Sequence, residues 1–516
     1  MFNFDRSAII KNTASSPVWM HFGAGNIFRG YIARLQQDLL EIGESESGII
    51  AVETFDYDII EKIYKPHDNI ALLCTLNPDG MIDQKLIGSI THALRADNDA
   101  SEINDIFRNP SLQIISLTIT EKGYAIKDMS GGFLPVIEAD INAGPDKAAH
   151  VMSRLAAGCY YRYTNGGGEL ALVSFDNCSN NGDLIKDGVM QIARAWQQRG
   201  FVDEGFIGYL GGGKISYPIT MVDKITPRPS ETVLKTLIEQ GLEGMDIVIT
   251  GKNTFIAPFV NAERPEYLVI EDDFPNGRPP LEKAGVLFAD RHTVMQAEVM
   301  KVTTCLNPLH TALAIFGCLL NYETIADEMK DADLRRLAEI IGYDEGMKVV
   351  VDPKIICPKA FLDEVINVRL PNPFLMDMPQ RITTDTSQKI PVRFGNTIKK
   401  YLKDETLFAA SLEGIPLTIA AWLRYLLGVD DNLNPMTISP DPLLSEMQAM
   451  LAGITASEPK SYTGQLKGVL NSEMLFGVNL YDAGLGEKIE GMFVQMLSGV
   501  GAVRAVLRDN VRRDDY

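Results

Sequence analysis

Cysteine is scarce in this chain, and its six cysteines are arranged neither for disulfide pairing nor for binding zinc. There is no CxxC pair, and even the two closest cysteines are well separated in the sequence. This usage excludes a disulfide scaffold and a cysteine-rich zinc site, and it predicts unpaired thiols in a reducing cytoplasm. The cysteines are Cys74, Cys159, Cys178, Cys305, Cys318 and Cys357.

Positive charge is also in short supply. Of 516 residues, 48 are Lys or Arg and 68 are Asp or Glu, so the formal net charge is −20. A surface of this sign argues against a partner such as nucleic acid or an anionic lipid layer. A small anionic substrate remains compatible with it, because a few buried cations can reverse the potential locally.

Several familiar signatures are missing. The six histidines are scattered without HExxH or comparable spacing, so no metal site is predicted, and no GxSxG motif occurs.

Residues 1–16 include Asp5 and Lys11 and lack an apolar run, which predicts no signal peptide. The longest uncharged run, residues 302–322, contains Asn307 and Pro308, so we expect a core helix and not a membrane span. We therefore expect a soluble, cytoplasmic protein.

The N-terminal part of the chain alternates between strand-like and helical patterns. An apolar run at residues 18–22 ends in a glycine turn, residues 27–40 have helical spacing, and a second apolar run at residues 49–52 ends at Glu53. The same alternation follows with strand-like runs at 113–120 and 170–174 and a helical pattern at 147–163. Such alternation predicts an α/β domain whose parallel sheet is covered on both faces.

The remainder of the chain is different in character. The stretch 246–278 is richer in proline and in strand-like runs, and from about residue 293 the pattern is mainly helical. We predict one domain over residues 1–290 and a mostly α-helical domain over residues 291–516, while the sequence leaves the oligomeric state open. The expected helices cover residues 311–320, 326–341, 411–427 and 443–451.

The glycine turn at residues 21–30 has the features of a dinucleotide-binding turn. Gly23 would allow a tight bend, and Gly25 would let the backbone approach a pyrophosphate at the start of the next helix. Glu53 ends the next strand, where a carboxylate accepts hydrogen bonds from ribose hydroxyls and repels a 2′-phosphate, which favours NAD over NADP. The third glycine, Gly30, lies further away than in GxGxxG, so ordinary turn glycines and a solvated Glu53 remain the alternative.

The segment 298–310 contains a lysine, an asparagine and a histidine suited to alcohol or ketone chemistry. On one continuous helix Lys301 and His310 would lie on opposite faces. Pro308 predicts a break, with a new helix beginning at Pro308 and Asn307 as its N-cap, which could gather the three residues. A desolvated lysine exchanges a proton near neutral pH, and amide and imidazole groups hold an oxygen that changes charge. The alternatives are a simple cap, a first-turn histidine and a surface lysine.

Seven blocks of the sequence carry a resemblance to a known family. They lie at residues 23–30, 116–124, 174–182, 221–227, 269–279, 298–310 and 372–389. In this order they resemble the polyol-specific long-chain dehydrogenase/reductase family, also called the mannitol dehydrogenase family. The resemblance implies a Rossmann-type N-terminal domain, a mostly helical C-terminal domain and a cleft between them without a catalytic metal.

The resemblance also implies roles for individual residues. Lys301 corresponds to the general acid/base, Asn177 and Asn307 to amides that hold the reacting oxygen, His310 to a substrate-hydroxyl partner, and Glu298 to a carboxylate that aids proton exchange. The spacing from Lys301 to Asn307 is one residue longer than in the mannitol-oxidising members. Implied substrate-pocket residues are Asp223, Arg381 and Lys389, and implied cofactor-binding residues are Gly23, Gly25, Asn26, Phe28, Arg29 and Glu53.

The implied activity is NAD-dependent interconversion of a keto-sugar acid and its aldonate. D-fructuronate and D-mannonate are the favoured pair. Arg381 and Lys389 are expected to hold the carboxylate, with Lys122 as a further candidate, and an arginine can bind it through two hydrogen bonds. D-mannitol with D-fructose, or D-tagaturonate, are the alternative substrates. A non-catalytic NAD-binding sensor is an alternative of another class, and it predicts a damaged Lys/Asn/His set, whereas all three residues are present. A helical scaffold with an incidental glycine turn is the third.

Overall fold

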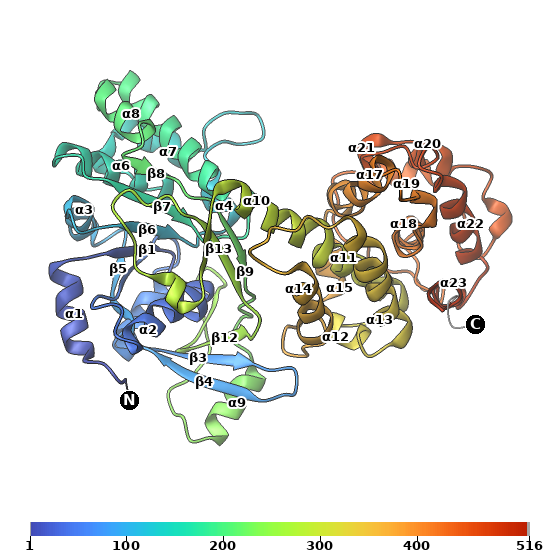
Figure 1. Cartoon of the computed structure of the whole chain (residues 1–516), viewed down its shortest axis with the longest axis horizontal. Coiled ribbons are helices and arrows are strands. Elements are labelled where there is room, and N and C mark those ends of the chain that lie inside the picture. Colours follow the sequence, from blue (N-terminus) through green and yellow to red (C-terminus); the bar gives the residue numbers. More distant parts are fainter. Residues whose placement is uncertain (1, 513–516) are drawn as a thin grey trace. The chain divides into compact units, whose positions relative to one another are not determined.

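The computed structural model describes residues 2–512 of the chain. These residues form two compact units. The N-terminal unit consists of residues 2–77 and 81–295, and the C-terminal unit consists of residues 78–80 and the chain from Gln296 onward (Figure 1).

A six-stranded parallel sheet lies at the centre of the N-terminal unit. Its strand order is β5-β2-β1-β6-β7-β8, and all neighbouring strands are parallel. Five of its strands are buried along their whole length, as expected of a parallel sheet covered on both faces. The predicted α/β architecture is therefore confirmed. The strands are β1 (Trp19–Phe22), β2 (Ile49–Glu53), β5 (Ile90–Arg95), β6 (Ile114–Leu117), β7 (Leu170–Ser174) and β8 (Ile215–Ser216).

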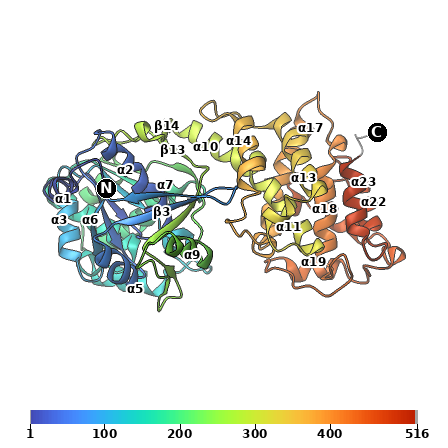
Figure 2. The ribbon, with the colours of Figure 1, turned by 90° about the horizontal axis from the view of Figure 1, so that it is seen from below.

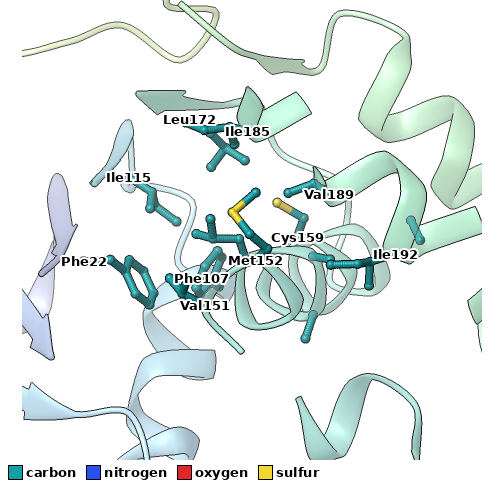
Figure 3. Packing of buried hydrophobic residues seen from close by; sticks show 14 of the residues in the cluster. Phe22, Phe107, Ile115, Val151, Met152, Cys159, Leu172, Ile185, Val189 and Ile192 are labelled. Atoms are coloured by element: carbon teal, nitrogen blue, oxygen red, sulfur yellow. The ribbon is translucent and has the colours of Figure 1, made fainter. Parts of the chain in front are cut away.

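Alternate side chains of the sheet enter two different apolar clusters. Trp19 and Ile114 belong to one cluster, whereas Phe22 and Ile115 belong to the other, because successive strand residues point to opposite faces. Figure 3 shows the second cluster, in which strand residues meet side chains of α6 and α7. The main helices of this unit are α1 (Arg6–Ser15), α2 (Ala33–Glu41), α3 (Ala100–Arg108), α5 (Pro135–Ala143), α6 (Val151–Thr164), α7 (Asn181–Gln198), α8 (Glu204–Gly211) and α9 (Glu231–Glu239).

In the N-terminal unit, three elements differ clearly from their predicted bounds. The predicted strand 113–120 ends at Leu117, because Thr120 begins the short helix α4 (Thr120–Tyr124). The predicted helix 147–163 begins only at Val151, since the carboxylate of Asp140 accepts the two backbone N–H groups just before it. The helix predicted over 27–40 starts as a π-helical turn, η1 (Phe28–Ile32), and continues as α2.

Smaller sheets complete the N-terminal unit. One has the order β12-β3-β4, another the order β14-β13-β9, and the third consists of β10 and β11. The proline-rich stretch 246–278, predicted to hold strands, contains β10, β11, β12 and β13. These strands are β3 (Ala71–Leu76), β4 (Ile82–Ile87), β9 (Thr220–Asp223), β10 (Val248–Ile249), β11 (Phe255–Ile256), β12 (Phe259–Glu263), β13 (Tyr267–Glu271) and β14 (Leu287–Ala289).

The C-terminal unit is mostly helical, as predicted (Figure 2). Helix α18 is buried at every residue and packs against α11 and α22, so these helices form the core of the unit. The longest of its helices are α11 (Asn307–Leu320), α13 (Ala332–Glu339), α14 (Pro358–Glu364), α17 (Asn396–Lys403), α18 (Gly414–Tyr425), α19 (Leu444–Met450), α22 (Gly486–Met496) and α23 (Ala502–Val511).

All six cysteines are free thiols, and four of them are buried. The stretch Arg291–Leu320 is long and apolar enough to cross a membrane, but 78% of its most apolar window is buried inside the protein. It therefore has the burial of a core helix, in agreement with the prediction for residues 302–322.

Candidate active site

The turn after β1 requires glycine at one position and is open at another. Gly23 has a φ of +105°, and a Cβ there would lie 2.1 Å from the carbonyl oxygen of Thr118. Glycine is needed because the turn passes directly against the end of β6. No atom lies within 4 Å of the Cβ position of Gly25, so the backbone there is accessible to a ligand.

The carboxylate of Glu53 holds this turn in place. Its Oε2 accepts from the N–H of Ala24 at 2.9 Å, while its Oε1 accepts from the N–H groups of Thr54 at 2.9 Å and Phe55 at 2.8 Å. A carboxylate oxygen accepts about two hydrogen bonds. Oε1 is therefore saturated, whereas Oε2 keeps room for one more donor.

A pocket of about 750 Å³ lies beside the turn. Gly23, Gly25 and Glu53 all line it, so the structure brings these three predicted cofactor residues together. The ring of Phe55, which is 65% exposed, also lines the pocket, and the ammonium group of Lys252 lies 5.1 Å from the centre of that ring.

The other three predicted cofactor residues are not among the described residues that line the pocket, and two of them, Phe28 and Arg29, are buried. The ring of Phe28 stacks on His21 with centroids 4.1 Å apart. The buried guanidinium of Arg29 donates to the carbonyl of Ala257 at 2.7 Å and to the side-chain oxygen of Asn26 at 2.9 Å. These contacts stabilise the turn without contributing to the pocket wall.

Asp176, just after β7, organises another wall of the pocket. Its carboxylate accepts from the backbone N–H groups of Ile119 at 2.8 Å and Thr120 at 3.0 Å, and from the hydroxyl of Tyr124 at 2.6 Å. Thr120 lines the pocket with a φ of +62°, which is costly for a β-branched residue. Burial raises the pKa of Asp176, although these donors oppose the rise. Asn177 follows directly and is exposed.

In the C-terminal unit, Lys301 lies at the start of a wide helical turn. Helix α10 (Arg291–Met300) continues as the π-helical turn η6 (Lys301–Cys305), in which the N–H of Leu306 donates to the carbonyl of Lys301 at 3.1 Å. Lys301 is only 2% exposed. The predicted break is confirmed, since Leu306 leaves helical geometry with φ −128° and ψ −62°.

The role predicted for Asn307 as N-cap is wrong. Helix α11 begins at Asn307 itself, Leu306 is the N-cap residue, and no side chain caps the helix. The wide turn before it takes up one residue more than an α-helical turn, which moves Asn307 into the first turn. Its half-buried amide is therefore not used for capping.

His310 and Arg381 meet at one carboxylate. The Oδ2 atom of Asp377 lies 3.4 Å from Nε2 of His310, and its Oδ1 atom accepts from the guanidinium of Arg381. Burial opposes ionisation of Asp377, but the contacts with His310 and Arg381 hold its pKa below the usual value. Helix α15 (Pro379–Ile382), which carries Arg381, packs against α11.

Lys389 lies nearby on α16 (Thr386–Ile390). Its Nζ donates to the carbonyl of Ile382 at 3.0 Å and to that of Thr384. Burial, and then the neighbouring charge of Arg393, lower the pKa of Lys389. His310 and Arg381 therefore share Asp377, and Lys389 binds backbone carbonyls that closely follow Arg381 in the chain.

Two further predicted residues belong to other elements. Asp223 is the buried last residue of β9 in the N-terminal unit, and Glu298 is half-buried on α10 next to the lysine segment. Among residues 2–512, no group of three or more His, Cys, Asp or Glu side chains is arranged to hold a metal ion.

Both units correspond to domains of one family. Residues 18–283 match the mannitol dehydrogenase Rossmann domain, and residues 293–496 match the mannitol dehydrogenase C-terminal domain. The chain belongs to the mannitol dehydrogenase family.

Individual relatives agree with this. The chain is 51% identical to a D-mannonate oxidoreductase of Thermotoga maritima over 517 aligned positions, which cover 99% of this chain and 96% of that protein. Its fold is similar to that of a D-sorbitol dehydrogenase solved in substrate-free form, with a TM-score of 0.78, 24% identity and coverage of 98% and 96% of the two chains. It is also similar to Pseudomonas fluorescens mannitol 2-dehydrogenase in a ternary complex with NAD and D-mannitol, with a TM-score of 0.68, 25% identity and coverage of 96% and 94%.

Three residues of this mannitol dehydrogenase family member were missed from the sequence. Asp176 lies inside one of the blocks that carry the resemblance, but its bonds to Thr120 depend on the pairing of distant strands. Asp377 could have been found, because a carboxylate four residues before Arg381 is typical of a local ion pair. No local sequence pattern of this kind marks Arg393.

Proposed function

We propose that this protein is an NAD-dependent oxidoreductase that interconverts D-fructuronate and D-mannonate. The observation that carries the proposal is the 51% identity, over nearly the full length of both chains, to a D-mannonate oxidoreductase. The cationic residues Arg381, Lys389 and Arg393 in the C-terminal unit of a chain with net charge −20 add support, since an anionic substrate needs a locally positive site.

The pocket of the N-terminal unit fits NAD(H). Gly25 leaves the backbone open to a pyrophosphate, and Oε2 of Glu53 retains an acceptor position for a ribose hydroxyl. Bound NADH supplies the hydride for the reduction. Glu53 would repel a 2′-phosphate, whereas Lys252 beside Phe55 would attract one, so a comparison of NADH with NADPH tests this preference directly.

Lys301 is proposed as the general acid/base. In the reductive direction its Nζ gives a proton to the carbonyl oxygen of the substrate, and in the oxidative direction it takes that proton back. We assign the amides of Asn177 and Asn307 to holding this oxygen as its charge develops, and His310 to a substrate hydroxyl. Glu298, three residues before Lys301, would pass the proton to solvent. Asp223 is proposed as a further substrate contact.

Polyol oxidation is the second candidate. The similarity to a mannitol 2-dehydrogenase bound to NAD and D-mannitol favours it, although the identity of 25% is half that to the mannonate relative. The six free cysteines are consistent with the cytoplasmic location that either activity would require.

The deciding experiment follows NADH absorbance with D-fructuronate, D-tagaturonate and D-fructose in parallel. A clear preference in kcat/KM for D-fructuronate is expected. A preference for D-fructose would instead establish a polyol dehydrogenase, and a preference for D-tagaturonate would move the assignment to that uronate. Tight NADH binding without turnover of any substrate would favour the non-catalytic sensor.

A further inference from the structure

Arg393 is a cation without a carboxylate partner among the described residues. It lies on the π-helical turn η10 (Pro391–Gly395), is half-buried, and donates from one terminal nitrogen to the hydroxyl of Thr311 at 2.5 Å. Burial alone lowers its pKa to about 10, with no acidic side chain offsetting the desolvation. Burial of an arginine favours pairing with an anion, so the remaining donors of Arg393 suit an anion from outside the chain.

The position of Arg393 connects it with the proposed site. Its partner Thr311 follows His310 and donates to the backbone carbonyl of Asn307 at 3.0 Å, so Arg393, Thr311 and Asn307 form a hydrogen-bonded chain. The turn η10 also packs against η6, which begins with Lys301. All these contacts lie within the C-terminal unit.

The two other cations of this region are already engaged by groups of the chain. Arg381 is 66% exposed and paired with Asp377, and Lys389 uses two of its three N–H donors on backbone carbonyls. Arg393 keeps several N–H donors in a planar fork, the geometry that binds a carboxylate through two parallel hydrogen bonds. Lys389 is close enough for its charge to add to that of Arg393.

We propose that Arg393, oriented by Thr311 and assisted by Lys389, binds the carboxylate of the sugar-acid substrate and so selects uronates over neutral ketoses. The assignment rests on the proposed function. It differs from the clamp expected from the sequence, because it gives Arg393 the leading part and leaves Arg381 to hold Asp377 beside His310.

The test compares two substrates that differ in the charged group. D-fructose has a hydroxymethyl group where D-fructuronate has its carboxylate, so kinetics with both separate carboxylate binding from general damage. Arg393→Gln should raise KM for D-fructuronate about 100-fold, the loss expected for a charge-assisted hydrogen-bonded pair, and leave KM for D-fructose unchanged. Arg393→Lys keeps the charge but loses the planar fork of donors, so its KM for D-fructuronate should rise by an intermediate amount, about tenfold. Lys403→Gln, which removes an exposed charge on α17, is the matched control and should leave KM for both substrates unchanged.

The outcomes are distinguishable. An unchanged KM for D-fructuronate in Arg393→Gln, or an equal loss of activity on both substrates, would overturn the assignment of Arg393. Wild-type protein that does not reduce D-fructuronate would overturn the proposed function itself. Where Arg393→Gln is poorly folded, Thr311→Ala gives the same test, because loss of the orienting hydroxyl should raise KM for D-fructuronate alone. Equilibrium binding of D-mannonate and D-mannitol in the presence of NADH gives a second readout, in which only D-mannonate should be weakened.

Discussion

The backbone N–H of Leu306 donates to the carbonyl of Lys301 at 3.1 Å, so this turn of the helix contains five residues where an α-helical turn would hold four. The turn ends where Leu306 breaks the helix, and it sets the distance along the chain from the proposed acid/base to Asn307. The additional residue between Lys301 and Asn307 expected from the sequence falls in this wide turn.

Deletion of Val302 should therefore misplace the amide of Asn307 relative to Lys301. We expect kcat to fall about 100-fold, because a displacement of roughly an ångström in a catalytic set has that effect. Val302→Ala keeps the chain length and is the control, with turnover close to wild type. Steady-state kinetics of both proteins, after circular dichroism has shown native helix content, make the comparison. Full turnover in the deletion variant would show that the turn does not position the site.

Asp377→Asn should impair catalysis by releasing His310. The neutral amide loses most of its attraction for His310 and Arg381, which removes the group that orients the imidazole. Loss of such an orienting carboxylate typically costs about 10- to 100-fold, and we expect this loss in kcat/KM together with an altered pH profile. Asp385→Asn, at an exposed carboxylate nearby, is the control. An unaltered pH–rate profile in Asp377→Asn would contradict this role.

Asp176→Asn should weaken cofactor binding. The amide retains one acceptor oxygen for three donors, so the segment at Thr120 loses the bonds that hold its unfavourable φ of +62°. We expect the Kd for NADH to rise about tenfold, equivalent to about 1.4 kcal/mol, with little change in KM for the sugar acid. Fluorescence titration with NADH measures this. If instead NADH affinity is unchanged, the wall of the pocket formed by Thr120 does not contact the cofactor.

His21 should make the protein less stable in mild acid. It is fully buried between Ser116 and Thr118, and burial lowers its pKa from 6.5 to about 3. Below pH 6.5 the unfolded chain binds a proton that the folded protein does not, so the free energy of unfolding falls by about 1.4 kcal/mol per pH unit from this group. The loss begins near pH 6.5 and continues toward pH 3.

Urea unfolding at pH 7.5 and pH 5 of the wild type and of His21→Gln measures this contribution. The variant loses hydrogen bonds and should be less stable at both pH values, but the difference between the two proteins should narrow at pH 5 by about 2 kcal/mol. A constant difference would show that the imidazole is protonated in the folded protein.

Local patterns predicted much of this structure. The apolar runs that became β1, β2 and β7, the glycine turn, Glu53 and the break before Pro308 all depend on neighbouring residues, and each occurs where expected within a few positions. The inward orientation of Phe28 and Arg29 was not visible, because it results from packing on His21 and on the distant Ala257. The cap role of Asn307 failed because a π-helical turn has no signature in residue types. Arg393 was missed because it is distinguished by having no acidic partner among the described residues, and the sequence alone does not show which charges are paired.

Proton transfer by Lys301 is tested most directly by the turnover of Lys301→Ala with D-fructuronate and NADH at neutral pH. A proton-transfer group contributes about 10²- to 10⁴-fold, so kcat should fall by about three orders of magnitude while the Kd for NADH stays at its wild-type value. Such a result would assign proton transfer to Lys301. Turnover of D-fructuronate at the wild-type rate by Lys301→Ala would show that Lys301 is not the general acid/base.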